Sequence, residues 1–168
     1  MVLTGEPGGT EIGASIRDIL LSPAHREALT PLSELLLFMA SRAQHVREVV
    51  LPELDLGKTV VSSRYRLSSL AYQGYGRGLD LSLIQRLNEE STCGREADIT
   101  FLIDAPAEFV LGRRRGGGDR IEAETLEFYK RVRQGFLELV AGDSRVLCLD
   151  GTLSISSIAD AVAKRLGL

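Results

Sequence analysis

The chain has 168 residues, of which 44% are hydrophobic and 26% are charged, as is typical of one globular domain with a single core. Its formal net charge of −3 excludes a broad basic field, so we expect no nucleic-acid partner. No apolar run is long enough to span a membrane and no signal peptide opens the sequence. We therefore expect a cytoplasmic protein without a membrane partner.

The two cysteines are too few for a disulfide framework and fit a reducing compartment. Cys148 lies in the apolar run 146–149, which predicts a buried structural thiol. Cys93 is a candidate surface thiol to which we assign no role. The sequence suggests no metal-ligating residue.

Four short β-rich runs alternate with helical patterns, at residues 2–4, 59–62, 99–104 and 145–149. The last three are apolar throughout, as is typical of strands covered on both faces. Strands that alternate with helices indicate a parallel α/β sheet in one domain, residues 1–168.

Apolar residues at helical spacing predict the helices between these strands. The longest begins after Thr30, with Pro31 at its first position, and Gly57 closes it. Three further helices are expected at residues 80–90, 123–140 and 154–166. A parallel α/β domain normally opens with a strand, a loop and a helix over roughly 30 or more residues, and this sequence begins directly on what should be a later strand. We therefore expect that the first strand, loop and helix are missing.

Three segments contain residue types suited to nucleotide chemistry. Gly8-Gly9 precedes a helix that carries Arg17, and such a turn lets backbone N–H groups approach an anion, although it is also an ordinary turn. Phe38 and Arg42 share a helix face, where a ring could stack on a base and a guanidinium could bind its edge. The alternative is that Phe38 belongs to the core and Arg42 is a solvated flank.

The third segment begins at the carboxyl end of the 59–62 strand, where ligands of open parallel sheets bind. Arg64 lies at that end and can pair with a phosphate. Ser69 and Gln73 follow at helical spacing. Such a density of polar and glycine residues is difficult to explain by packing alone.

These segments resemble the thymidylate kinase family. The resemblance rests on residues 6–10 (EPGGT), 36–45 (LLFMASRAQH), 64–78 (RYRLSSLAYQGYGRG) and 119–122 (DRIE), in the family's order and near its spacing. It implies a three-layer α/β/α P-loop kinase fold with a parallel sheet and a lid at about residues 112–120. It also implies dTMP and ATP as nucleotide partners, Mg²⁺ bound with ATP, and a possible homodimer through the long helix.

The resemblance also implies roles for individual residues. Phe38 would stack on thymine, Arg42 would bind its edge, and Arg64 would hold the monophosphate. The remaining dTMP-binding residues would be Arg17 at the phosphate, Ser69 and Gln73 at the base, and Tyr72 beside the sugar. Glu6 would lie near the phosphates and magnesium. The lid arginines Arg113, Arg114 and Arg115 would stabilise charge on the transferred phosphoryl group, or alternatively form a solvated helix end.

The sequence departs from the family pattern at three places. It contains no Gly-x-x-x-x-Gly-Lys-Ser/Thr motif, so the Walker A loop is missing and the chain alone should not transfer phosphate from ATP. Gly5 replaces the arginine of the family's Arg-Glu-Pro motif, and Ser63 replaces the aspartate before Arg64. The missing first strand would lie between the 59–62 and 99–104 strands. Without it, the 59–62 and 99–104 strands should pair directly with each other or accept a strand from another chain. Otherwise the natural protein is longer than this sequence.

Three functional hypotheses follow. The first is a thymidylate kinase that phosphorylates dTMP to dTDP and whose P-loop unit is absent from this sequence. The second is an inactive nucleotide-binding paralogue that senses dTMP or pairs with an active subunit, because Gly5 and Ser63 alter otherwise intact motifs. The third is an eroded gene whose product does not fold.

Overall fold

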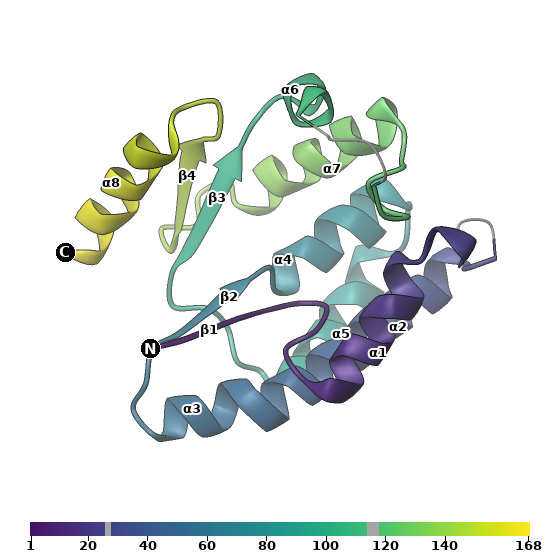
Figure 1. The fold of residues 1–168 in the computed structure, drawn as a ribbon, viewed down its shortest axis with the longest axis horizontal. Coiled ribbons are helices and arrows are strands. Elements are labelled where there is room, and N and C mark those ends of the chain that lie inside the picture. The colour runs from purple at the N-terminus through teal and green to yellow at the C-terminus, as the bar shows by residue number, and fades with distance from the viewer. Residues whose placement is uncertain (26–27, 114–117) are drawn as a thin grey trace.

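The computed structural model describes residues 1–25, 28–113 and 118–168 (Figure 1). In chain order its elements are β1 (Val2–Gly5), α1 (Glu11–Leu21), the 3₁₀ turn η1 (Pro23–His25), α2 (Pro31–His45), the π-helical η2 (Val46–Val50), α3 (Leu51–Asp55), β2 (Val60–Ser63), α4 (Arg66–Ser69), the π-helical η3 (Leu70–Gly76), α5 (Leu81–Thr92), β3 (Thr100–Asp104), α6 (Ala107–Gly112), α7 (Leu126–Leu139), β4 (Val146–Asp150) and α8 (Ile155–Leu166). All four predicted strands are present to within a residue or two. Among the helices in the described ranges, none is both long and apolar enough to cross a membrane.

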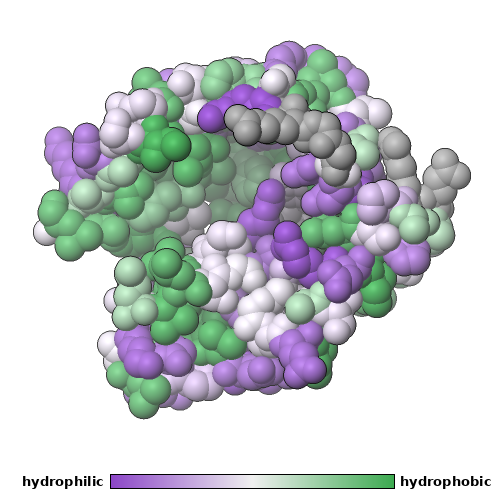
Figure 2. Space-filling model, viewed as in Figure 1, coloured by the Kyte–Doolittle hydropathy of each residue, from purple (hydrophilic) through white to green (hydrophobic). Residues whose placement is uncertain are grey.

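The strands form two separate parallel pairs. β1 pairs with β2 in the register Val2 to Val60, and β3 pairs with β4 in the register Thr100 to Val146. Within the described ranges no ladder joins the two pairs, so β2 and β3 do not close up against each other. Figure 2 shows the molecule hollowed between the half that contains β1 and β2 and the half that contains β3 and β4.

The expectation that the last three strands are covered on both faces is wrong. Val61 in β2 is 47% exposed and Ile103 in β3 is 57% exposed. Cys148 in β4 is likewise exposed, which corrects the prediction of a buried thiol. Neighbouring residues of a strand point to opposite faces, and because the two pairs stand apart, one face of each lacks a packing partner. Cys93 is exposed and also a free thiol.

The long predicted helix is continuous as α2, η2 and α3. The Thr30 hydroxyl caps it by accepting from the Ser33 amide, and Pro31 occupies the first turn. Its inner face holds Leu35 and Met39, which pack with Leu70 and Ile84. A second cluster joins η3 to α7 through Ala71, Phe128 and Val132. These two clusters fix the position of η3, which carries several predicted site residues.

Gly9 is the tightest backbone position beside α2. Its φ is +79°, and a Cβ there would lie 2.6 Å from Cδ2 of His45. We expect Gly9→Ala to lower the free energy of unfolding by about 2–4 kcal/mol, through left-handed strain and overpacking together. Gly57→Ala is the matched control, because φ is +70° there but no described atom lies within 4 Å of the added Cβ. Equal decreases in the free energy of unfolding for Gly9→Ala and Gly57→Ala, measured by urea denaturation, would contradict the overpacking proposed at Gly9.

Candidate functional site

A cavity of about 220 Å³ opens at the carboxyl ends of β1 and β2. Its walls include all seven residues proposed for dTMP binding together with Glu6. These are Glu6, Arg17, Phe38, Arg42, Arg64, Ser69, Tyr72 and Gln73. Residues 119, 121 and 122, from the segment before α7, also line it. The structure therefore brings together side chains that are up to 123 positions apart, from Glu6 to Tyr129, at the edge of the sheet where parallel α/β proteins bind ligands.

The cavity has a basic side made by Arg17 and Arg64, which are both exposed. Arg17 extends from α1, and its Nη1 donates to the carbonyl of Pro7 at 2.9 Å. Arg64 follows β2, where its guanidinium lies 4.9 Å from the ring centroid of Tyr72 and its Nη2 donates to the Tyr72 hydroxyl at 3.3 Å. Asp119 and Glu122 also line the cavity, but neither arginine forms an ion pair with a carboxylate of the described residues, so both guanidiniums can pair with a phosphate.

Arg64 has a strained backbone. Its φ is 70°, in the left-handed region that non-glycine residues rarely occupy. The Ser62 hydroxyl donates to the Arg64 carbonyl at 2.9 Å and helps to hold this conformation. Strain of this kind concentrates at functional positions, and here it sets the direction in which an exposed arginine leaves the strand.

Arg42 is the centre of a buried polar network at the floor of the cavity and is only 2% exposed. Its Nε donates to Glu6 Oε2 at 2.7 Å, and its Nη1 donates to the Ser69 hydroxyl at 3.0 Å and to Asn88 Oδ1 at 2.5 Å. Its Nη2 donates to the carbonyl of Tyr65 at 3.2 Å. The alternative interpretation, that Arg42 is a solvated flank, is therefore wrong. Among the described residues, four oxygen partners account for four of its five N–H groups, and one donor is left for a ligand.

Glu6 lies at the cavity but its carboxylate points into the protein. Arg42 occupies one oxygen, and Nδ1 of His45 lies 3.2 Å from the other. Nε2 of His45 in turn bonds to the Thr4 hydroxyl at 2.7 Å. In the described part of the chain, no group of three or more acidic, histidine or cysteine side chains could hold a metal ion. Both carboxylate oxygens of Glu6 have protein partners, and the place of this side chain near magnesium stays a prediction.

Phe38 and Tyr72 supply the aromatic walls, and both are half-buried. Leu35 and Met39 on the same helix fill the core, whereas Phe38 lines the cavity, so it is not simply a core residue. Tyr72 is held edge-on by Phe128 and Phe136, each with its ring centroid 6.1 Å away. Both rings line the cavity, and an aromatic face can stack on a flat base.

The lid arginines are placed differently from the other predicted residues. Arg113 follows the last turn of α6, is exposed, and lies 5.4 Å from the ring centroid of Phe109. It is not among the residues that line the cavity, and its role in a lid stays a prediction. Arg114 and Arg115 lie outside the described residues.

Sequence reasoning missed a second buried charged cluster, centred on Glu34 of α2. Glu34 is 1% exposed, accepts hydrogen bonds from Gln73 and Arg77, and forms an ion pair with Arg120. Asn88 and His45, which hold Arg42 and Glu6, were also given no role. His45 and Arg120 belong to the quoted motifs, but nothing in a linear motif shows that a charged side chain is buried against another.

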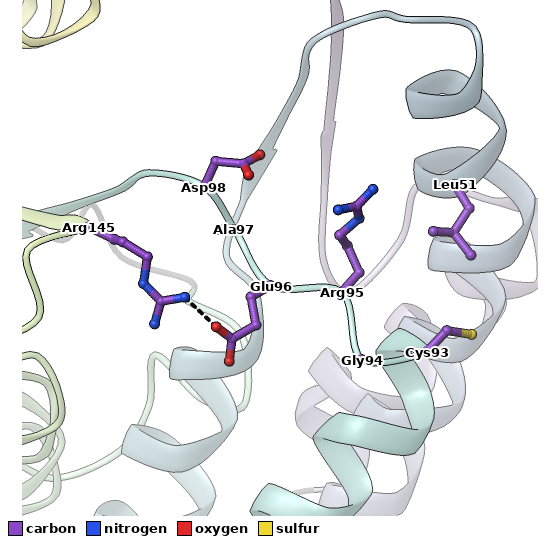
Figure 3. A pocket seen from close by; sticks show the side chains of 8 residues that line it. All are labelled: Leu51, Cys93, Gly94, Arg95, Glu96, Ala97, Asp98 and Arg145. Atoms are coloured by element: carbon purple, nitrogen blue, oxygen red, sulfur yellow. Dashed lines mark hydrogen bonds and ion pairs between the residues drawn. The ribbon is translucent and has the colours of Figure 1, made fainter.

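A second hollow, of about 530 Å³, lies at the amino ends of β3 and β4 (Figure 3). Its most prominent charges are Glu96 and Arg145, which form an ion pair across it, and Arg145 also pairs with Asp143. None of the predicted site residues lines this hollow. The cavity at the carboxyl ends of β1 and β2 is therefore the candidate site.

Parallel strand pairs with helices between them, and a cavity with arginine and aromatic side chains at the strands' carboxyl ends, are typical of α/β proteins that bind ligands at this edge. A model of the thymidylate kinase family matches residues 1–162. The chain is 49% identical to the thymidylate kinase of Kosmotoga olearia over 97% of this chain and 79% of that protein, and 51% identical to that of Carboxydothermus hydrogenoformans over 89% and 73%. The crystal structure of thymidylate kinase from Ehrlichia chaffeensis superposes with a TM-score of 0.76 at 35% identity, covering 99% of this chain and 80% of that one.

The chain belongs to the thymidylate kinase family. The prediction of an α/β P-loop kinase fold is thereby confirmed.

Proposed function

We propose that the cavity binds dTMP as the phosphoryl acceptor, and that the family's reaction, transfer from ATP to dTMP to give dTDP, is the one this site serves. The convergence of Phe38, Arg42, Arg64 and Gln73 on one cavity carries the proposal. Phe38 would stack on thymine while Arg64, with Arg17, neutralises the monophosphate. Tyr72 would pack against the sugar and exclude a 2′-hydroxyl.

The protein's contribution to such a transfer is positioning and charge stabilisation rather than covalent chemistry. Arg64 would fix the acceptor phosphate so that one of its oxygens faces the donor. Arg42 would orient the base through its remaining N–H group. The arginines of the segment 113–115 would stabilise charge on the moving phosphoryl group. Mg²⁺, bound with ATP, would neutralise charge on the donor phosphates.

A specific observation favours the second candidate, an inactive paralogue that binds dTMP. The two departures from the family motifs, Gly5 and Ser63, are register partners at the ends of β1 and β2. A Cβ at position 5 would lie 2.9 Å from the Ser63 hydroxyl. An arginine and an aspartate at these positions would be direct neighbours, so the two losses remove one charged pair beside the phosphate side of the cavity.

The donor side distinguishes the two candidates, because the 168 residues contain no Walker A motif. The test joins the strand-loop-helix unit of the Kosmotoga olearia relative to this chain and measures ADP release with ATP, Mg²⁺ and dTMP. Turnover by this fusion would support a kinase. Binding of dTMP without turnover until Gly5→Arg and Ser63→Asp are added would support the paralogue. No turnover in either form would contradict the proposed reaction.

We also propose that the chain forms a homodimer in the cytoplasm, through the outer face of α2. Leu32 and Leu36, one helical turn apart, are 47% and 48% exposed, and an apolar stripe of this kind is typical of a helix interface. We expect Leu36→Glu to convert a dimer to a monomer in light scattering coupled to size-exclusion chromatography. Ile19→Glu on α1 is the control. A wild-type chain that is monomeric at high concentration would contradict the proposal.

A further inference from the structure

The orientation of the Gln73 side chain is fixed by a carboxylate behind it. Gln73 is 2% exposed and lines the cavity. Its Nε2 donates to Glu34 Oε1 at 2.8 Å. A carboxylate accepts hydrogen bonds and donates none, so the amide must turn its nitrogen toward Glu34. The amide oxygen is then the atom that remains for a ligand.

Two arginines hold Glu34 in its ionised form. Arg77 donates to both of its oxygens, Nε to Oε1 at 3.2 Å and Nη2 to Oε2 at 3.1 Å. Nη2 of Arg120 lies 2.6 Å from Oε2 in an ion pair, while its Nε donates to the carbonyl of Leu20 at 2.8 Å. Burial alone would raise the pKa of Glu34, but the hydrogen bonds from Arg77 and Gln73 outweigh it and the pKa lies below its ordinary value. Glu34 is therefore a permanent acceptor at neutral pH.

We infer that Glu34 is a positioning residue that sets the base specificity of the cavity, by forcing Gln73 to present an acceptor to the base. The inference rests on the proposed binding of dTMP. Thymine carries an N–H donor at N3, which matches an acceptor. Cytosine has an acceptor at the same position, so its N3 would face the Gln73 oxygen without a proton between them. A cavity built in this way selects thymine over cytosine although Glu34 itself does not touch the base.

The same geometry predicts what happens when Glu34 is replaced by glutamine. Two arginine Nη2 groups lie at the Oε2 side and only the Nε of Arg77 lies at the Oε1 side, so the new amide oxygen would take the Oε2 position and the new NH₂ group would face Gln73. Gln73 would then turn its oxygen to residue 34 and its NH₂ group to the cavity. Affinity for dTMP should fall and affinity for dCMP should rise.

The experiment measures dTMP and dCMP binding to the 168-residue chain by calorimetry, for the wild type and for Glu34→Gln. We expect the ratio of the two affinities to fall at least tenfold in Glu34→Gln, since a donor and an acceptor exchange places. Arg77→Gln is the matched control, because it weakens the cluster but leaves the carboxylate facing Gln73. Glu34→Asp, which keeps an acceptor, should retain the wild-type preference even if both affinities decrease.

A purely structural role would lower stability in both Glu34→Gln and Arg77→Gln and leave the affinity ratio unchanged, and that result would overturn the inference. If Glu34→Gln alone does not fold, the double variant Glu34→Gln/Arg77→Gln replaces it, because it lacks the Arg77 Nε donor that would oppose the new amide. Its ratio of dTMP to dCMP affinity must then fall at least tenfold relative to that of Arg77→Gln. A wild-type chain that prefers dTMP, with an unchanged ratio in the variants, contradicts only this inference. A wild-type chain that binds neither nucleotide overturns the proposed function and the inference with it.

Discussion

Replacing Arg42 by methionine should lower the free energy of unfolding by about 3–5 kcal/mol, because it leaves the carboxylate of Glu6 buried without its cation. Glu6 is 6% exposed, and water cannot readily replace the lost partner. The same change removes donors from the Ser69 hydroxyl and from Asn88 Oδ1. His45 remains beside Glu6 but contacts the other oxygen. The loss should appear as an early midpoint in urea denaturation.

Arg66→Met is the matched control for Arg42→Met. Arg66 forms two ion pairs and its side chain is 19% exposed, but its partners Glu89 and Glu96 are 59% and 51% exposed, so no carboxylate would be left buried without its cation. Ion pairs with exposed partners contribute about 0–1 kcal/mol, so Arg66→Met should lower stability clearly less than Arg42→Met. If the two variants lose equal stability, the network around Arg42 does not stabilise the fold as described.

Replacing Arg64 by alanine should weaken dTMP binding by about 10- to 100-fold, as expected from the loss of charge-assisted hydrogen bonds worth about 1.5–3 kcal/mol. Arg64 is exposed and its side chain contacts the protein through Tyr72, so the stability of the fold should change little. A loss of dTMP affinity without a loss of stability would identify Arg64 as a ligand-binding residue. Calorimetry and thermal denaturation on the same sample measure both.

Arg86→Ala is the control for the loss of one positive charge. Arg86 lies on α5, where it donates to Ser82, and it does not line the cavity. The Arg86→Ala substitution should leave dTMP affinity unchanged. Raising the salt concentration should weaken dTMP binding to the wild type more than to Arg64→Ala, because the phosphate contact is electrostatic. Equal affinities of Arg64→Ala and Arg86→Ala would contradict the phosphate-binding role of Arg64.

The local sequence predicted most of the secondary structure, because caps and strand patterns are encoded by neighbouring residues. Thr30 with Pro31 marked the start of α2, and the apolar run at 146–149 marked β4. Burial of the strands was not predictable in this way. Cys148 is exposed because one face of β4 has no packing partner. Whether a strand face is covered depends on elements that are distant in the sequence.

The candidate site was predictable where it follows a motif and not where it depends on three-dimensional pairing. Phe38, Arg64 and Gln73 were identified from contiguous patterns and lie at one cavity. The interaction of Glu34 with Arg120 joins residues 86 positions apart, and no local pattern indicates it. No local pattern indicates the buried ion pair of Arg42 with Glu6 either. This pair gives both residues a part in stabilising the fold that the motifs did not indicate.

The two strand pairs bear on the donor side of the proposed reaction. Within the described ranges β2 pairs only with β1, and β3 only with β4. The residues that line the acceptor cavity come from α1, α2, α4, η3 and α7 and from the loops beside them, and none of them belongs to a strand. The cavity therefore does not need a ladder between the two strand pairs. We therefore expect acceptor binding to be measurable apart from phosphoryl transfer.

The most direct test of the acceptor site is a calorimetric titration of dTMP into the 168-residue chain and into Phe38→Ala. We predict one dTMP bound per wild-type chain, and binding weakened about 5- to 150-fold by loss of the stacking ring, which is worth about 1–3 kcal/mol per base. A chain that melts cooperatively yet binds no dTMP at millimolar concentration would contradict the account. So would wild-type affinity in a folded Phe38→Ala variant.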